Sequence, residues 1–61
     1  MNREEVIVAI GLWIESIIDD LGDLAIVQNN DVKLFLLNRI QLYSNLIGGA
    51  VDAFKEDMTN G

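Results

Sequence analysis

Isoleucines and leucines recur every three or four residues through the first half of this sequence. The positions are Ile7, Ile10, Ile14, Ile17, Leu21 and Leu24. Steps of three and four place side chains on one face of an α-helix and match the spacing of a coiled coil. No proline interrupts the chain, and β-branched residues do not alternate with polar ones as they do in strands. The pattern predicts a helix over about residues 3–28.

The second half of the chain has the same spacing over a wider face. Its apolar stripe runs through Leu36, Ile40, Tyr43, Ile47, Ala50 and Phe54. Flanking apolar residues widen this stripe to roughly half of the helix circumference, which is more than one neighbouring helix covers. We expect a second helix over about residues 32–57. Asparagines and an aspartate before it supply turn and N-cap groups, which predicts a turn over about residues 29–31.

Glycines interrupt both helical patterns. Gly22 can act as a C-cap, with a short separate helix after it. Gly48 and Gly49 either lie within the second helix or end it. We expect the helix to continue through both, because Gly11 lies level with them in an antiparallel hairpin that turns near residue 29 or 30. A close approach of the two helices at Gly11 and Gly49, or space there for the ring of Trp13, would offset part of the cost of glycine.

The same hairpin brings opposite charges level with one another. The expected pairs are Arg3 with Glu56, Glu4 with Lys55, and Asp20 with Arg39. Arg39 projects from the apolar arc of the second helix, so we expect it to reach the rim or to pair with Asp20 of its own or a neighbouring chain. The alternative is that Arg39 contacts an anion or a partner together with Tyr43.

A chain of 61 residues has little interior of its own. Small chains are usually stabilised by disulfides, a structural metal or self-association, and this sequence has neither cysteine nor histidine. We therefore expect one all-α domain over residues 1–61. It is predicted to be an antiparallel hairpin of two long helices that self-associates as a homodimeric four-helix bundle. A higher oligomer is the nearest alternative, because such wide apolar arcs accept further neighbours.

The apolar stripes of both helices supply the predicted oligomer interface. On the first helix it comprises Ile7, Ile10, Trp13, Ile14, Ile17 and Leu21. On the second helix it comprises Leu36, Ile40, Tyr43, Ile47 and Phe54. Trp13 is expected to be a core or interface anchor, and the alternative is a hot spot for a different partner.

The charge of the chain narrows the choice of partners. Four basic and ten acidic residues give a net charge of −6. Such a surface repels phosphate backbones and anionic membranes, so we expect no direct nucleic-acid or membrane binding. The apolar runs are shorter than the roughly 20 residues of a membrane span, and no charged leader precedes a short apolar core. The expected location is the cytoplasm, and the expected partner is a basic protein.

Metal binding and catalysis find little support. The acidic residues Glu15, Asp19, Asp20 and Asp23 fan over roughly 140° of the first helix, and they are expected to form a solvated surface. The chain has neither an EF-hand loop nor the Glu-x-x-His pairs of di-iron bundles. General acid–base catalysis lacks a histidine or cysteine. We predict no metal, no cofactor and no enzyme activity.

Apolar residues also lie among the polar ones and indicate another covered surface, formed by contacts inside a larger assembly or around the turn, or by a patch for a different protein. The possible partner surface comprises Val8, Leu12, Glu15, Asp19, Leu34 and Leu37. The leading functional hypothesis is a non-enzymatic protein–protein interaction module, an adaptor or inhibitor of a basic partner, that acts as a homo-oligomer. One alternative is a nucleic-acid mimic, although the second helix has few of the acidic residues this needs. The other is a purely structural assembly or scaffold protein.

Overall fold

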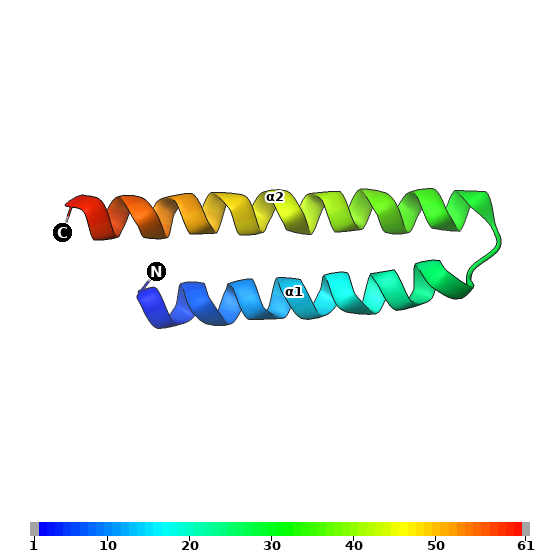
Figure 1. Cartoon of the computed structure of the whole chain (residues 1–61), viewed down its shortest axis with the longest axis horizontal. Helices are drawn as coiled ribbons and strands as arrows, with labels where there is room; N and C mark the ends of the chain where they lie inside the picture. The colour runs from blue at the N-terminus through cyan, green and yellow to red at the C-terminus, as the bar shows by residue number, and fades with distance from the viewer. Residues whose placement is uncertain (1, 61) are drawn as a thin grey trace.

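Two α-helices joined by a short turn make up residues 2–60, which are the residues that the computed structural model describes (Figure 1). Helix α1 spans Arg3–Ile26 and helix α2 spans Asn30–Asn60. The helices run antiparallel along a body of 48 × 15 × 14 Å, and no strand occurs in the described part. The predicted all-α helical hairpin is therefore confirmed.

Helix α1 begins with a capping box. The side-chain oxygen of Asn2 accepts a hydrogen bond from the backbone N–H of Glu5 at 2.8 Å, and the Glu5 carboxylate accepts one from the backbone N–H of Asn2 at 3.4 Å. The helix ends at Ile26, because Val27 is extended, with φ −72° and ψ 137°. The backbone N–H of Val27 still donates to the carbonyl of Asp23 at 3.0 Å, which satisfies one terminal carbonyl.

Helix α2 begins at Asn30 and not near residue 32, because Asn29 is the residue that caps it. The side-chain oxygen of Asn29 accepts from the backbone N–H groups of Asp31 and Val32 at 2.8 and 3.2 Å. At the other end, the helix extends beyond residue 57 to Asn60. The observed bounds therefore differ from the expected ones by two residues at the end of α1 and the start of α2, and by three at the end of α2. The turn accordingly spans residues 27–29 and not 29–31.

No glycine breaks either helix. Helix α1 runs through Gly11 and Gly22, and α2 runs through Gly48 and Gly49, as expected. The expected reason for Gly11 and Gly49 is wrong, however. A Cβ atom added at any of the four would meet nothing within 4 Å, so neither a close approach of α1 to α2 nor the ring of Trp13 needs the space.

The contact between α1 and α2, called the seam below, buries few side chains. Leu36 is the one buried apolar residue among those described, and none of their side chains is less than 2% exposed. Fourteen large apolar side chains remain between 40% and 78% exposed. The chain exposes 4702 Å², whereas a compact protein of its mass exposes about 3,950 Å². A single hairpin therefore leaves much of its apolar surface in water.

Candidate interaction surfaces

The aliphatic face combines one side of α1 with one side of α2. Its members are Ile7, Ile14, Ile18 and Leu21 of α1 and Leu37, Val51 and Met58 of α2. The α1 members step by seven, four and three residues and the α2 members by multiples of seven, so each set lies on one side of its helix. A groove of about 180 Å³ is lined by Ile7, Ile10, Val51, Phe54 and Lys55. This groove shows that the two sets share one side of the hairpin.

The arginine face lies on the other side of the hairpin and belongs to α2. Its members are Phe35, Arg39, Leu42, Leu46, Gly49 and Ala53, which step by four and three residues. A second groove, of about 520 Å³, is lined by Asn2, Arg3, Val6, Ala53, Phe54 and Asp57. Phe54 lines both grooves, with Val51 and Lys55 at one and Ala53 at the other. The arginine face and the aliphatic face therefore lie on opposite sides.

Arg39 is the centre of a polar and aromatic cluster on the arginine face. Its Nε atom lies 3.2 Å from Oδ2 of Asp20, so the predicted pairing with Asp20 occurs within the chain. The guanidinium carbon also lies 5.7 Å from the centroid of the Phe35 ring and 5.9 Å from that of Tyr43. These distances are those of cation–π contacts. The Arg39 side chain is still 42% exposed.

Asp20 is the most buried charged residue, with 4% of its surface exposed. Among the described residues its Oδ2 atom has no hydrogen-bond donor, although it is close enough to Arg39 for an ion pair. The contact is therefore an ion pair in which the Nε–H bond is poorly aligned with the oxygen. An incompletely paired buried carboxylate costs free energy, so we expect this cluster to contribute more to the alignment of the helices than to stability.

The two other expected charge pairs are wrong. Arg3 donates to Asp57 at 3.0 Å, one residue beyond the expected Glu56, and both side chains are mostly exposed. Glu4 and Lys55 form no ion pair with each other. Each of them lines a different groove, Glu4 on the outer side of α1 and Lys55 beside Ile7.

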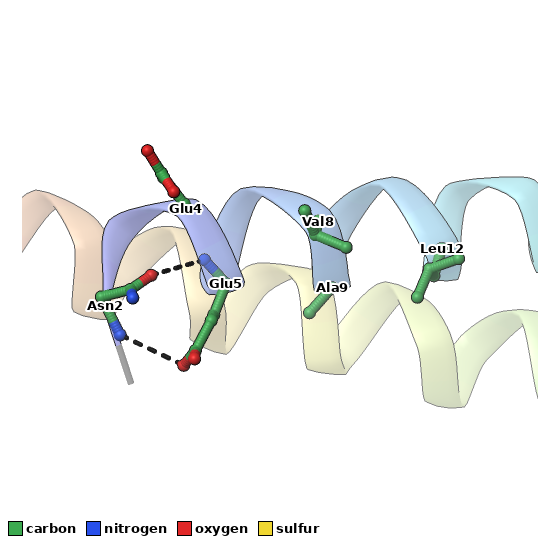
Figure 2. Close-up of a pocket in the computed structure, with 6 residues that line it drawn as sticks. All are labelled: Asn2, Glu4, Glu5, Val8, Ala9 and Leu12. Atoms are coloured by element: carbon green, nitrogen blue, oxygen red, sulfur yellow. Dashed lines mark hydrogen bonds between the residues drawn. The ribbon is translucent and has the colours of Figure 1, made fainter.

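The outer face of α1 points away from α2 and carries carboxylates around two aliphatic side chains. Its members are Glu4, Glu5, Val8, Leu12, Glu15 and Asp19, all of them exposed. Figure 2 shows its first half, a shallow groove of about 510 Å³ lined by these first four residues with Asn2 and Ala9. Val8 is 60% exposed and Leu12 is 58% exposed. The capping box holds the Glu5 carboxylate beside Asn2, whereas Glu4 extends away from the helix.

The residues of the predicted partner surface do not all come together. Val8, Leu12, Glu15 and Asp19 share the outer face of α1, with Val8 and Leu12 in its first half. Leu34 and Leu37 lie in the first two turns of α2, beside the turn of the hairpin and therefore at the opposite end from Val8. Leu37 belongs to the aliphatic face. Asn2, Glu4 and Glu5 are not among the residues of the predicted partner surface, although the Asn-x-x-Glu spacing of a capping box is a signal for Asn2 and Glu5.

The residues of the predicted oligomer interface divide into two groups. Eight are half-buried or buried at the seam between α1 and α2, namely Ile10, Trp13, Ile17, Leu36, Ile40, Tyr43, Ile47 and Phe54. The other three, Ile7, Ile14 and Leu21, are exposed on the aliphatic face. The hairpin therefore uses most of this set internally and leaves one side of α1 uncovered.

Comparison with known proteins gives this chain no family assignment. No protein family model, no curated protein and no solved structure matches this chain. Among residues 2–60, no three His, Cys, Asp or Glu side chains gather closely enough to hold a metal ion. Neither of the two described helices has the length and apolar content needed to cross a membrane. The fold and charge define the chain as a two-helix antiparallel hairpin with a net charge of −6.

Proposed function

We propose that this chain is a small acidic protein–protein interaction module, an adaptor or inhibitor that acts as a homo-oligomer and binds a basic partner protein through the outer face of α1. The observation that carries this proposal is the arrangement of carboxylates around Val8 and Leu12. No part of the described chain covers these two side chains, and exposed apolar residues rimmed by polar ones are typical of protein interaction sites.

The charge distribution favours a basic partner. Helix α1 contains six of the ten acidic residues and a single cation, Arg3, which is already paired with Asp57. The outer face of α1 therefore presents carboxylates without competing cations. Lysine or arginine side chains of a partner would pair with Glu15 and Asp19, which guides association, while apolar side chains would bury Val8 and Leu12.

The experiment is affinity capture on the immobilised chain, followed by quantitative mass spectrometry. Leu12→Asp and Glu15→Lys alter the outer face, whereas Leu42→Asp places the same charge on a similarly exposed leucine of the arginine face. We expect basic proteins that wild type and Leu42→Asp both retain and that Leu12→Asp and Glu15→Lys lose. Their retention should fall as salt is raised, because exposed charge pairs are screened. If no retained protein depends on Leu12 or Glu15, the proposal is wrong.

A purely structural role is the second candidate, favoured by the presence of uncovered apolar residues on opposite sides of the hairpin. A chain with two such sides can add copies at both and grow without closing. Light scattering at working concentration distinguishes the two candidates. Polymers that lengthen with concentration support the structural role, whereas particles of one fixed size support the interaction module.

A further inference from the structure

The excess surface of the hairpin matches one protein interface. The chain exposes roughly 750 Å² more than a compact protein of its mass. Each partner of a standard stable interface buries roughly 800 Å². One partner per hairpin would therefore bring its surface to the level of a compact protein.

The aliphatic face is better suited to burial than the arginine face. None of its seven members carries a charge, and Ile7, Ile14, Ile18 and Leu21 are each 44% to 60% exposed. Among the described residues, the one cation in its groove is Lys55, whose flexible stem can keep the ammonium at the rim. The arginine face would have to bury the half-exposed guanidinium of Arg39, and removing a charge from water is costly. An acidic chain that associates with itself must also keep its carboxylates apart, and the aliphatic face contains none.

We propose that a second copy of this chain covers the aliphatic face, with a two-fold axis parallel to the helices, so that α1 of each copy packs against α2 of the other. This inference rests on the homo-oligomer in the proposed function and specifies the surface and the symmetry. The product is a bundle of four helices in which every neighbouring pair is antiparallel.

The register of the hairpin supports this symmetry. Asp20 lies level with Arg39, and Ile7 lies level with Val51. A two-fold axis parallel to the helices keeps every residue at its own level, so the same register recurs between the copies. Ile7 then meets Val51 of the second copy, Ile18 meets Ile40, and Leu21 meets Leu37.

The same register accounts for Gly11, which the hairpin alone does not explain. Gly11 lies between Ile7 and Ile14 on the side of α1 that forms the aliphatic face, and its missing side chain leaves open space within the chain. In the proposed bundle it meets Ile47 of the second copy, and Ile14 meets the small Ser44. At these two levels a large residue of one copy therefore faces a small residue of the other, which permits close packing there.

The charges favour the parallel axis over a perpendicular one. Glu4 and Lys55 are level but form no ion pair with each other. Lys55 lines the groove beside Ile7, and Glu4 lies seven residues before Gly11, which places it at the edge of the aliphatic face on α1. The parallel axis brings Glu4 of each copy beside Lys55 of the other. A perpendicular axis instead packs α1 against α1, with its midpoint between Ile14 and Ile18, and brings the two copies of Glu15 together. Like charges at that position are unfavourable.

The first test compares two matched substitutions by sedimentation. Ile18→Asp alters the aliphatic face and Leu42→Asp alters the arginine face, at side chains that are 60% and 55% exposed. We expect wild type and Leu42→Asp to be dimers at micromolar concentration, and Ile18→Asp to dissociate at least about 100-fold more readily. A monomeric wild type overturns the inference, and so does a dimer that Leu42→Asp disrupts and Ile18→Asp does not.

The second test addresses the axis and does not depend on the folding of Ile18→Asp. Glu4→Lys and Lys55→Glu each place like charges together twice in a homodimer, so each should dimerise roughly threefold to tenfold more weakly than wild type. A mixture of the two variants restores both opposite-charge pairs. Native mass spectrometry should then show heterodimers well above their statistical share. A statistical mixture overturns the parallel axis, because a pair formed within one chain is indifferent to mixing.

These outcomes separate the inference from the proposed partner. If the dimer depends on Ile18 and no captured protein depends on Leu12, the inference about the dimer is supported and the proposal of a basic partner is wrong. A monomer that still captures a basic protein through Leu12 does the reverse. As a control, Leu12→Asp should sediment as wild type does, because Leu12 lies outside the aliphatic face.

Discussion

The most buried charge of the hairpin, on Asp20, is balanced by a cation that remains half in water. Arg39 lies between the rings of Phe35 and Tyr43 while its Nε atom approaches the Asp20 carboxylate. Cation–π contacts of this kind are attractive and hold the guanidinium near the two rings. Because Asp20 belongs to α1 and Arg39 to α2, the pair penalises any sliding of one helix along the other. Its main effect is on register.

Removing Arg39 should therefore cost more than removing the whole pair. We expect Arg39→Met to lower the free energy of unfolding by about 2 kcal/mol, because it leaves a buried carboxylate without a cation. The double variant Asp20→Leu, Arg39→Met should recover most of that loss, since no buried charge remains. Urea unfolding at one fixed protein concentration measures both. Equal stability of wild type and Arg39→Met would contradict the pairing.

The sequence predicted the positions of charged residues along the helix axes better than the directions in which their side chains point. The pair of Asp20 and Arg39 was predicted because an antiparallel register fixes which residues are level. The partner of Arg3 was off by one residue, since moving from Glu56 to Asp57 changes the level by about 1.5 Å but turns the side chain by about 100°. The same difficulty explains why Glu4 and Lys55, though level, do not meet within the chain.

At the scale of the helix, apolar spacing predicted the identity of both elements, and side-chain capping decided their ends. Three candidate caps follow one another in the turn, and periodicity alone does not choose among them. Asn29 takes this role because its side chain reaches the N–H groups of Asp31 and Val32. Glycines within α2 cost roughly 1 kcal/mol each relative to alanine, which the rest of a 31-residue helix can absorb.

Gly49 therefore offers a stabilising substitution. We expect Gly49→Ala to raise the free energy of unfolding by about 1 kcal/mol, because its φ is negative and an added Cβ meets nothing within 4 Å. Thermal or urea unfolding provides the measurement. A loss of stability would mean that something outside the chain covers Gly49, which would point to the arginine face as the site of a second copy.

For the molecule as a whole, length and composition predicted that one hairpin buries too few apolar side chains. They did not predict which surface stays uncovered. The apolar arcs were recognised as too wide for one neighbour. The side of α1 that shares a face with Val51 and Lys55 depends on the direction in which the chain turns, and apolar spacing carries no information about that direction. The residues of the predicted partner surface lie in different places for a related reason. An antiparallel hairpin places Leu34 and Val8 at opposite ends, although each is exposed on its own helix.

Stability of the whole molecule should depend on protein concentration. If folding is coupled to dimer formation, the midpoint of thermal unfolding should rise by about 5 °C for each tenfold increase in concentration. Ile18→Asp should lose this dependence, because its aliphatic face no longer accepts a second copy. Circular dichroism over a hundredfold range of about 1 to 100 μM is sufficient. A wild-type midpoint that stays constant over this range would show that one hairpin folds alone.

The hairpin brings the start of α1 and the end of α2 to the same end of the molecule, where Arg3 and Asp57 meet (Figure 1). In the proposed dimer the parallel axis gathers all four of these helix ends at one pole and both turns at the other. The two ends of such a dimer therefore differ. Any group attached near either helix end would lie beside the same group of the second copy, and not at the far end of a body 48 Å long.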